Sequence, residues 1–152
     1  MDKYKGFTIT RSENIEELQA KLVELVHNET GSEILHIQND DIENVFSLSF
    51  KTLPKSSNGA AHILEHTVLC GSKKYPVKDP FFSMHKRSLN TYMNALTGSD
   101  FTCYPAATLV KKDFYNLLDV YLDAVFHPNL DELSFLQEGH RLELQDTNVL
   151  QS

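Results

Sequence analysis

Two histidines and a glutamate stand close together in the run His62-Ile63-Leu64-Glu65-His66. If this run is helical, residues four apart lie on one face, one turn above each other, so both imidazoles can reach one metal ion. Glu65 borders the same face. Neutral imidazole is a good ligand for zinc, which can bring the pKa of a bound water to about 7, and a neighbouring carboxylate can take the proton of that water. The spacing therefore indicates a zinc site with a general base.

The bare motif has an alternative interpretation, because an amphipathic helix can carry two surface histidines and a glutamate with no metal. The order of the three residues is the inverted form of the His-Glu-x-x-His motif of zinc proteases. Gly71 stands just past the last expected turn, where glycine is typical of the C′ position of a helix. These signals predict a helix over residues 57–69.

The strands around this helix are predicted from hydrophobic spacing and turn residues. Residues 22–27 and 33–38 flank the turn 28–31 and favour a hairpin, although the periodicity also permits a helix over residues 15–26. The later part of the chain contains a run typical of a buried strand, at residues 45–50. Two further strands are expected at residues 91–96 and 101–104.

Four helix signals complete the pattern. Asn14, with Glu17 three residues later, is expected to cap a short helix. Asp79-Pro80 is a good start, with Asp as N-cap and Pro at the first helical position. Apolar residues at core spacing predict a helix over residues 112–126, and Asp131 is expected to cap a last helix through about Leu144. This order of elements predicts an α+β fold, an antiparallel-rich sheet with helices packed on it.

The composition limits the classes of function. The length of 152 residues suits a single domain with a real core, and 41% hydrophobic with 23% charged residues is typical of a folded chain. A net charge of −7 argues against a nucleic-acid partner, and no apolar run approaches the 18 residues of a membrane span.

Cys70 and Cys103 have no metal or redox spacing, so we expect reduced thiols. The first residues resemble neither a secretory signal nor a transit peptide, so a cytoplasmic location is expected. The isolated histidines are expected to be structural: His27, His36, His85, His127 and His140.

Two further runs, Lys73–Phe81 and Leu89–Pro105, follow the motif in order. Together with the motif they resemble the N-terminal region of the inverted-motif zinc peptidases, the insulinase or pitrilysin family, and in particular its presequence-protease and falcilysin-like branch. The resemblance extends from about Gly6 to about Leu144 and is strongest from Lys55 to Leu130. It implies that residues 1–152 form a single, incomplete N-terminal domain of the M16 type.

The resemblance also implies roles for individual residues. His62 and His66 are the expected zinc ligands and Glu65 the expected general base of a zinc metalloendopeptidase that hydrolyses oligopeptides. In the family, a strand beside the motif helix holds the peptide substrate by strand addition. Asn94, Ala95 and Thr97 are the expected substrate-binding residues, whereas the residues alone also fit an ordinary hairpin whose Thr and Tyr face solvent. The strand run of the family is matched by Asn94, Ala95, Thr97, Asp100, Thr102 and Tyr104.

The third zinc ligand is where the sequence departs from the family. In this branch it is a glutamate in a run like Asn-Glu-x-Lys-Gly, which is absent here. Glu143 is a candidate, since 76 residues separate it from His66 as in other branches. Its surroundings match the helix before the missing ligand, however, which favours a solvated charge on a helix face. The chain is thus expected either to work with the remaining domains, in the same longer chain or a second subunit, or to be a non-catalytic fragment or binding subunit that needs a partner chain.

Overall fold

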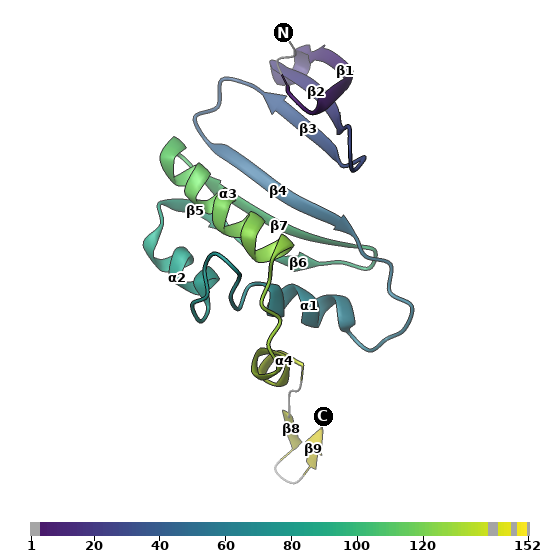
Figure 1. Ribbon diagram of the computed structural model, residues 1–152, viewed down its shortest axis with the longest axis vertical. Coiled ribbons are helices and arrows are strands. Elements are labelled where there is room, and N and C mark those ends of the chain that lie inside the picture. Colours follow the sequence, from purple (N-terminus) through teal and green to yellow (C-terminus); the bar gives the residue numbers. More distant parts are fainter. Residues whose placement is uncertain (1–3, 140–142, 147–148, 152) are drawn as a thin grey trace. The chain divides into compact units, whose positions relative to one another are not determined.

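The computed structural model describes residues 4–139, 143–146 and 149–151. The chain divides into two compact units, Met1–Ile42 and Glu43–Ser152 (Figure 1). That residues 1–152 make one incomplete domain stays a prediction.

The first unit is a three-stranded antiparallel sheet in the order β1 (Phe7–Ile15), β2 (Ala20–His27) and β3 (Glu33–Gln38). The predicted hairpin is confirmed: the Gly31 amide donates to the His27 carbonyl at 2.9 Å, and Gly31 has a φ of 71° that glycine adopts without strain. A helix over residues 15–26 is therefore excluded.

The predicted capping role of Asn14 is wrong. Asn14 pairs with Lys21 in the ladder between β1 and β2. The short 3-10 helix η1 (Glu16–Leu18) has Ile15 at its N-cap, with no side-chain hydrogen bond. Asn14 lies in the ladder between two strands instead of capping a helix, because strand pairing provides hydrogen-bond partners for the backbone in this segment.

The second unit contains an antiparallel sheet in the order β4 (Asn44–Lys51), β7 (Phe101–Thr108) and β5 (Asn90–Met93). The two-residue strand β6 (Leu96–Thr97) pairs with the first part of β7. Strand β4 alternates between faces, with every second residue half-buried and Val45 62% exposed. The predicted strand at residues 45–50 is confirmed, and its Phe46, Leu48 and Phe50 pack against the core. Only Val45 departs from the expected burial, because side chains along a strand point alternately to the two faces.

Helix α3 (Lys111–Phe126) lies on β7 and β4 (Figure 1). It confirms the predicted helix over 112–126, beginning one residue earlier. Its Leu117, Tyr121 and Ala124 are fully buried and form the core with residues of β5, β7 and the end of the motif helix. The ring of Tyr121 packs edge-on against Phe46 at 5.3 Å between centroids. Full burial of a side chain the size of Leu117 stabilises the fold by about 1.5–3 kcal/mol.

Two shorter helices differ from expectation at one end each. Helix α2 (Pro80–Arg87) begins with Pro80 as predicted, but Asp79 has a φ of 52° and its side chain makes no cap hydrogen bond. Helix α4 (Glu132–Glu138) begins as predicted, with the Asp131 carboxylate accepting from the Ser134 amide at 3.0 Å.

The predicted extension of α4 to about Leu144 is wrong. Helix α4 ends at Glu138 with Gly139 as C-cap, and Gly139 lies so close to Phe135 that a Cβ would meet the Phe135 carbonyl oxygen at 2.8 Å. Residues Glu143–Asp146 form strand β8, which pairs with β9 (Val149–Gln151). Glu143 therefore lies in a strand and not in a helix.

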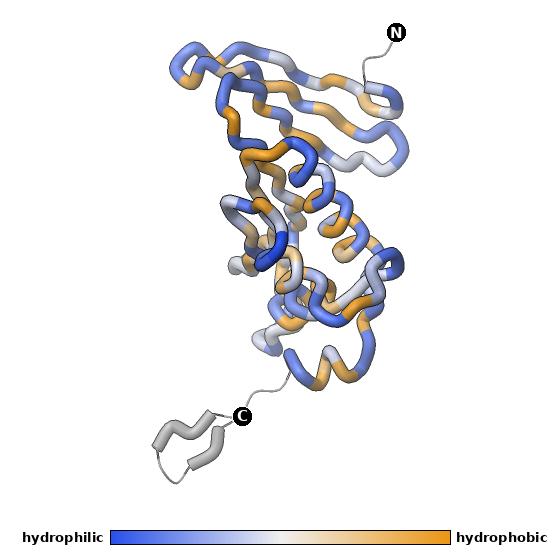
Figure 2. The backbone as a smooth tube through the Cα atoms, turned by 90° about the vertical axis from the view of Figure 1, so that its left-hand side faces the viewer, coloured by the Kyte–Doolittle hydropathy of each residue, from blue (hydrophilic) through white to orange (hydrophobic). Residues whose placement is uncertain are grey.

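The fold class is confirmed as α+β, with antiparallel sheets and helices on the larger one. Within the described residues, no helix is both long and apolar enough to cross a membrane. Figure 2 agrees, since apolar segments along the backbone are short and alternate with polar ones. Both cysteines are free thiols.

Candidate metal centre

Helix α1 (Ala60–Val68) carries all three motif residues, which confirms the helical prediction. It is shorter than predicted, because Gly59 at the N-cap has a φ of 70° that no helical residue adopts. Leu69 is the C-cap, so Cys70 occupies the C′ position and Gly71 lies one residue past it, not at C′ as predicted. A Cβ on Gly71 would lie 3.1 Å from the Val77 carbonyl oxygen, so the glycine allows the following loop to approach closely.

The two histidines converge on one point. The Nε2 atoms of His62 and His66 lie 3.2 Å apart, and both side chains are exposed. Two nitrogens bound at about 2.1 Å to one tetrahedral zinc ion lie about 3.4 Å apart. The pair is therefore already close to the separation that a shared zinc ion requires, with no change of the helix.

Glu138 of helix α4 orients one of these two histidines. Its Oε2 lies 2.9 Å from Nδ1 of His66, and α4 packs against α1. A carboxylate only accepts hydrogen bonds, so neutral His66 carries its proton on Nδ1 and directs the lone pair of Nε2 toward His62. A metal-binding histidine commonly donates its other N–H to a carboxylate in this way.

Glu65 lies on the covered side of α1, where it is only 5% exposed. The Thr97 hydroxyl donates to Oε2 of Glu65 at 2.6 Å. Burial, and to a lesser degree the charge of Glu65, raises the pKa of Tyr104 to about 12, so the phenol is neutral at physiological pH. The motif glutamate is thus a buried carboxylate held by a hydroxyl, which suits a base better than a solvated surface charge does.

The expected substrate-binding segment lies next to this helix, since α1 contacts both β6 and β7. Asn94 interrupts the edge between β5 and β6: its amide donates to the Pro105 carbonyl at 3.1 Å, and its own carbonyl accepts from the Tyr121 hydroxyl at 3.3 Å. Its side-chain Oδ1 accepts from the Ala95 amide at 2.9 Å. Among the described strands β6 pairs only with β7, so its other edge has backbone groups available for an added strand.

The ligand set is incomplete in the described part of the chain. There, no three residues of the types His, Cys, Asp or Glu gather around one point that could hold a metal ion. The side chain of Glu143 lies outside the described residues, as does His140, so the role of Glu143 as third ligand stays a prediction. A zinc site needs three or four protein ligands, and the two histidines are of a type that suits zinc. The described residues can therefore supply two of these ligands.

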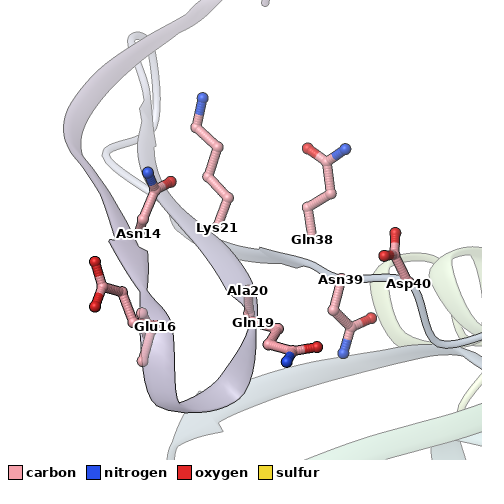
Figure 3. A pocket seen from close by; sticks show the side chains of 9 residues that line it. Asn14, Glu16, Gln19, Ala20, Lys21, Gln38, Asn39 and Asp40 are labelled. Atoms are coloured by element: carbon pink, nitrogen blue, oxygen red, sulfur yellow. The ribbon is translucent and has the colours of Figure 1, made fainter.

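Two other features of the chain stand outside the motif. A cavity of about 360 Å³ occurs within the first unit, lined mostly by polar residues at the ends of its strands and by none of the motif residues (Figure 3). Burial, followed by the charges of Asp79 and Glu138, raises the pKa of the Cys70 thiol, so Cys70 is poorly suited to act as a nucleophile.

Sequence reasoning missed Glu138 and the link between Thr97 and Glu65. Glu138 lies 72 residues after His66, and Thr97 lies 32 residues after Glu65. Helical spacing detects only partners within one or two turns, so no local pattern signals either contact.

Comparison with known proteins agrees with the geometry. Residues 53–151 match the family described as Insulinase (Peptidase family M16). The chain is 56% identical over 140 residues to "Presequence protease, mitochondrial" of Kluyveromyces lactis, covering 92% of this chain and 14% of that protein. It is 54% identical over 142 residues to the Mus musculus protein of the same name, covering 93% and 14%. The fold also matches the crystal structure of pitrilysin with a TM-score of 0.75 and 22% identity, covering 89% of this chain and 15% of that one.

These findings correct one prediction. The chain spans about 14% of the length of the presequence proteases that it matches. The expected cytoplasmic location is wrong, because the names of these relatives are those of mitochondrial proteins. The family itself is established by a match over more than half of the chain and by the ordered motifs of helix α1 and strands β5 to β7: the chain belongs to the insulinase family, peptidase family M16.

Proposed function

We propose that this chain is the N-terminal part of a zinc-dependent peptidase that hydrolyses oligopeptides, with His62 and His66 as metal ligands and Glu65 as general base. One observation carries the proposal: two Nε2 atoms lie 3.2 Å apart on a helix whose intervening glutamate is buried. An amphipathic surface helix needs neither feature. Family membership supports the peptidase class, and peptidases of this family are in general metal-dependent.

The names of the relatives suggest the substrate and the compartment. Since the matched proteins are called mitochondrial presequence proteases, we propose a mitochondrial location and extended peptides, such as targeting presequences, as the substrate. The free edge at β6 supports this, because added backbone hydrogen bonds hold any extended peptide regardless of its side chains. Asn94 and Ala95, at the break before β6, are the residues proposed to contact that peptide.

Each residue of the site has a distinct task. Bound zinc would supply a Lewis acid that lowers the pKa of water and polarises the scissile carbonyl. Glu65 accepts the proton of the attacking water and returns it to the leaving amine, the usual cycle of a general base. Glu138 keeps His66 in the tautomer whose Nε2 is free to bind a metal. Tyr104 stays neutral, so it adds no second negative charge near Glu65.

The rest of the longer protein is proposed to complete the site. A third ligand is proposed to come from a side chain outside the described residues, with Glu143 as the first candidate, or from residues beyond this chain, because the described residues provide only two. The family relatives are much longer, which supports further domains in the same polypeptide or, alternatively, a second subunit.

A second candidate function follows from the missing third zinc ligand. A chain with only two histidine ligands binds zinc weakly, so it can serve as a non-catalytic binding module that holds a peptide at β6. The two candidates differ in their response to metal: the peptidase needs zinc for its activity, whereas peptide binding to a strand edge does not.

The test measures zinc affinity first. Zinc is titrated into the purified 152-residue chain and into a His62→Ala/His66→Ala double variant. Tight histidine-dependent binding of one ion per chain would show a third ligand within these residues, with Glu143 as the first suspect. Weak binding to the chain, tightened in a longer protein that includes it, would support a ligand from outside.

The second measurement distinguishes the role of a metal ligand from that of a general base for Glu65. In the longer protein, Glu65→Gln is expected to retain zinc and to lose peptide hydrolysis, because the amide cannot accept the water proton. Normal turnover by Glu65→Gln would refute the assigned role. If the unaltered protein binds an extended peptide equally well with and without zinc and never cleaves it, the binding-module function is the correct one.

A further inference from the structure

The hydroxyl of Thr97 makes a short hydrogen bond to the motif glutamate. Thr97 Oγ1 donates to Oε2 of Glu65 at 2.6 Å, and Glu65 is buried. Hydrogen bonds of this kind, with an ionised acceptor, are shorter and about twice as strong as neutral ones. This contact is therefore the main fixed interaction of the Glu65 side chain with the sheet.

Two more threonines extend the contact into the sheet. Thr97 pairs directly with Thr102 in the ladder between β6 and β7, so their side chains share one face. Thr102 Oγ1 lies 3.4 Å from Thr97 Oγ1 and 2.9 Å from Thr52 Oγ1, and Thr102 is only 2% exposed. The link between Thr102 and Thr97 is long for a hydroxyl pair and therefore weak.

The direction of the Thr97 proton follows from the carboxylate. An ionised carboxylate only accepts, and a hydroxyl has one proton to donate. Thr97 uses its proton for Glu65, so in the long link to Thr102 it can only accept, whereas either hydroxyl can donate in the pair of Thr52 and Thr102. The same count shows that Thr97 has no second proton to offer to a peptide.

We propose that Thr97 is a positioning residue: it holds the Glu65 carboxylate in one rotamer by engaging Oε2, so that Oε1 receives the proton of the attacking water. This inference rests on the proposed role of Glu65 as base. It replaces the expectation that the Thr97 side chain binds the substrate. A base that is misplaced by about 1 Å can lose about a hundredfold in rate, so a fixed rotamer has a clear catalytic benefit.

Three variants of the longer protein test the proposal. Thr97→Val removes the hydroxyl and keeps the shape, and Thr97→Ser restores the hydroxyl. Thr91→Val is the matched control, because Thr91 of β5 also donates to a carboxylate, that of Glu43, in the same sheet. We expect Thr97→Val to lower kcat by about ten- to a hundredfold with KM within about twofold. Thr97→Ser is expected to recover most of kcat, and Thr91→Val to leave both constants unchanged.

Two kinetic results would overturn the proposal. A raised KM with normal kcat in Thr97→Val would mean that Thr97 contacts the substrate after all. Equal damage in Thr97→Ser and Thr97→Val would mean that the hydroxyl is not the important group. Zinc content is measured in parallel and is expected to be equal in all three variants, because Thr97 contacts neither histidine.

A metal-free measurement keeps this inference separate from the proposed function. In the 152-residue chain, labelled with ¹³C at glutamate side chains, Thr97→Val is expected to shift the carboxyl carbon resonance of Glu65 at constant pH, whereas Thr91→Val is not. An unshifted resonance would refute the contact itself. A longer protein that never hydrolyses peptides would refute the proposed function, and with it the catalytic purpose of a contact that the resonance still detects.

Discussion

Replacing Glu138 with glutamine tests whether the hydrogen bond from His66 to Glu138, which joins helices α1 and α4, orients His66 to bind a metal ion. Glutamine keeps the size of the side chain and can still accept the Nδ1 proton, so only the negative charge is lost. A hydrogen bond to a charged group contributes about 1.5–3 kcal/mol and a neutral one about 1 kcal/mol. The difference is about 1 kcal/mol, which corresponds to a loss of about fivefold in zinc affinity.

The solvent exposure of His66 and Glu138 decides whether the loss of zinc affinity is about fivefold or larger. Outer ligand partners in enclosed sites change metal affinity by about 10–100-fold. Here the His66 side chain is 46% exposed and that of Glu138 is 23% exposed, so water screens the charge and the smaller value is expected.

The assay is a calorimetric titration of zinc into the chain at neutral pH and low salt. Glu132→Gln is the control, because it removes the same charge from the exposed start of helix α4. Affinity is expected to fall about fivefold in Glu138→Gln and to change little in Glu132→Gln. Equal losses in both variants would show a general effect of charge, and no loss in Glu138→Gln would refute the role of Glu138 in preparing His66.

Two further predictions concern the scaffold around the site. Leu117→Ala empties a fully buried position of α3, so it is expected to lower the free energy of unfolding, measured in urea, by about 2–5 kcal/mol. Leu122→Ala is the control, at a position of α3 that is 38% exposed. An equally large effect of both variants would contradict a core centred on Leu117. Asp119 of α3 accepts hydrogen bonds from Lys74 and Tyr75, which lower the pKa of Asp119. This stabilisation is present above the ordinary aspartate pKa of about 3.9 and is lost as the pH falls through the lower folded-state pKa. The Tm difference between the unaltered chain and Asp119→Asn is therefore expected to shrink between about pH 6 and about pH 3, and a constant difference would contradict the assignment.

Elements whose signals are local were predicted well. Helix α3 follows from apolar residues at helical spacing, and the hairpin of β2 and β3 from a turn that contains Gly31. The N-cap at Asp131 formed as expected, since its hydrogen bond to Ser134 spans only three residues. In each case the residues that decide the structure are neighbours in the chain.

Predictions failed where tertiary contacts compete with a local signal. Asn14 has a good capping sequence, but pairing with Lys21 placed it in a strand. The last predicted helix stops at Gly139, where the close approach to Phe135 requires a glycine. Val45 looked like a core residue, and only the arrangement of helices on the sheet shows that its face is exposed.

The sequence by itself determined the motif and its spacing. Two histidines four residues apart on a helix must face the same side, because helix geometry leaves no alternative. The tertiary structure decided what surrounds them: the carboxylate of Glu138 on His66, and the hydroxyl of Thr97 on Glu65. These partners come from elements far along the chain, and the packing of α4 and β6 against α1 is what brings them within hydrogen-bonding distance. No periodicity encodes such contacts, since they depend on how whole elements fit together.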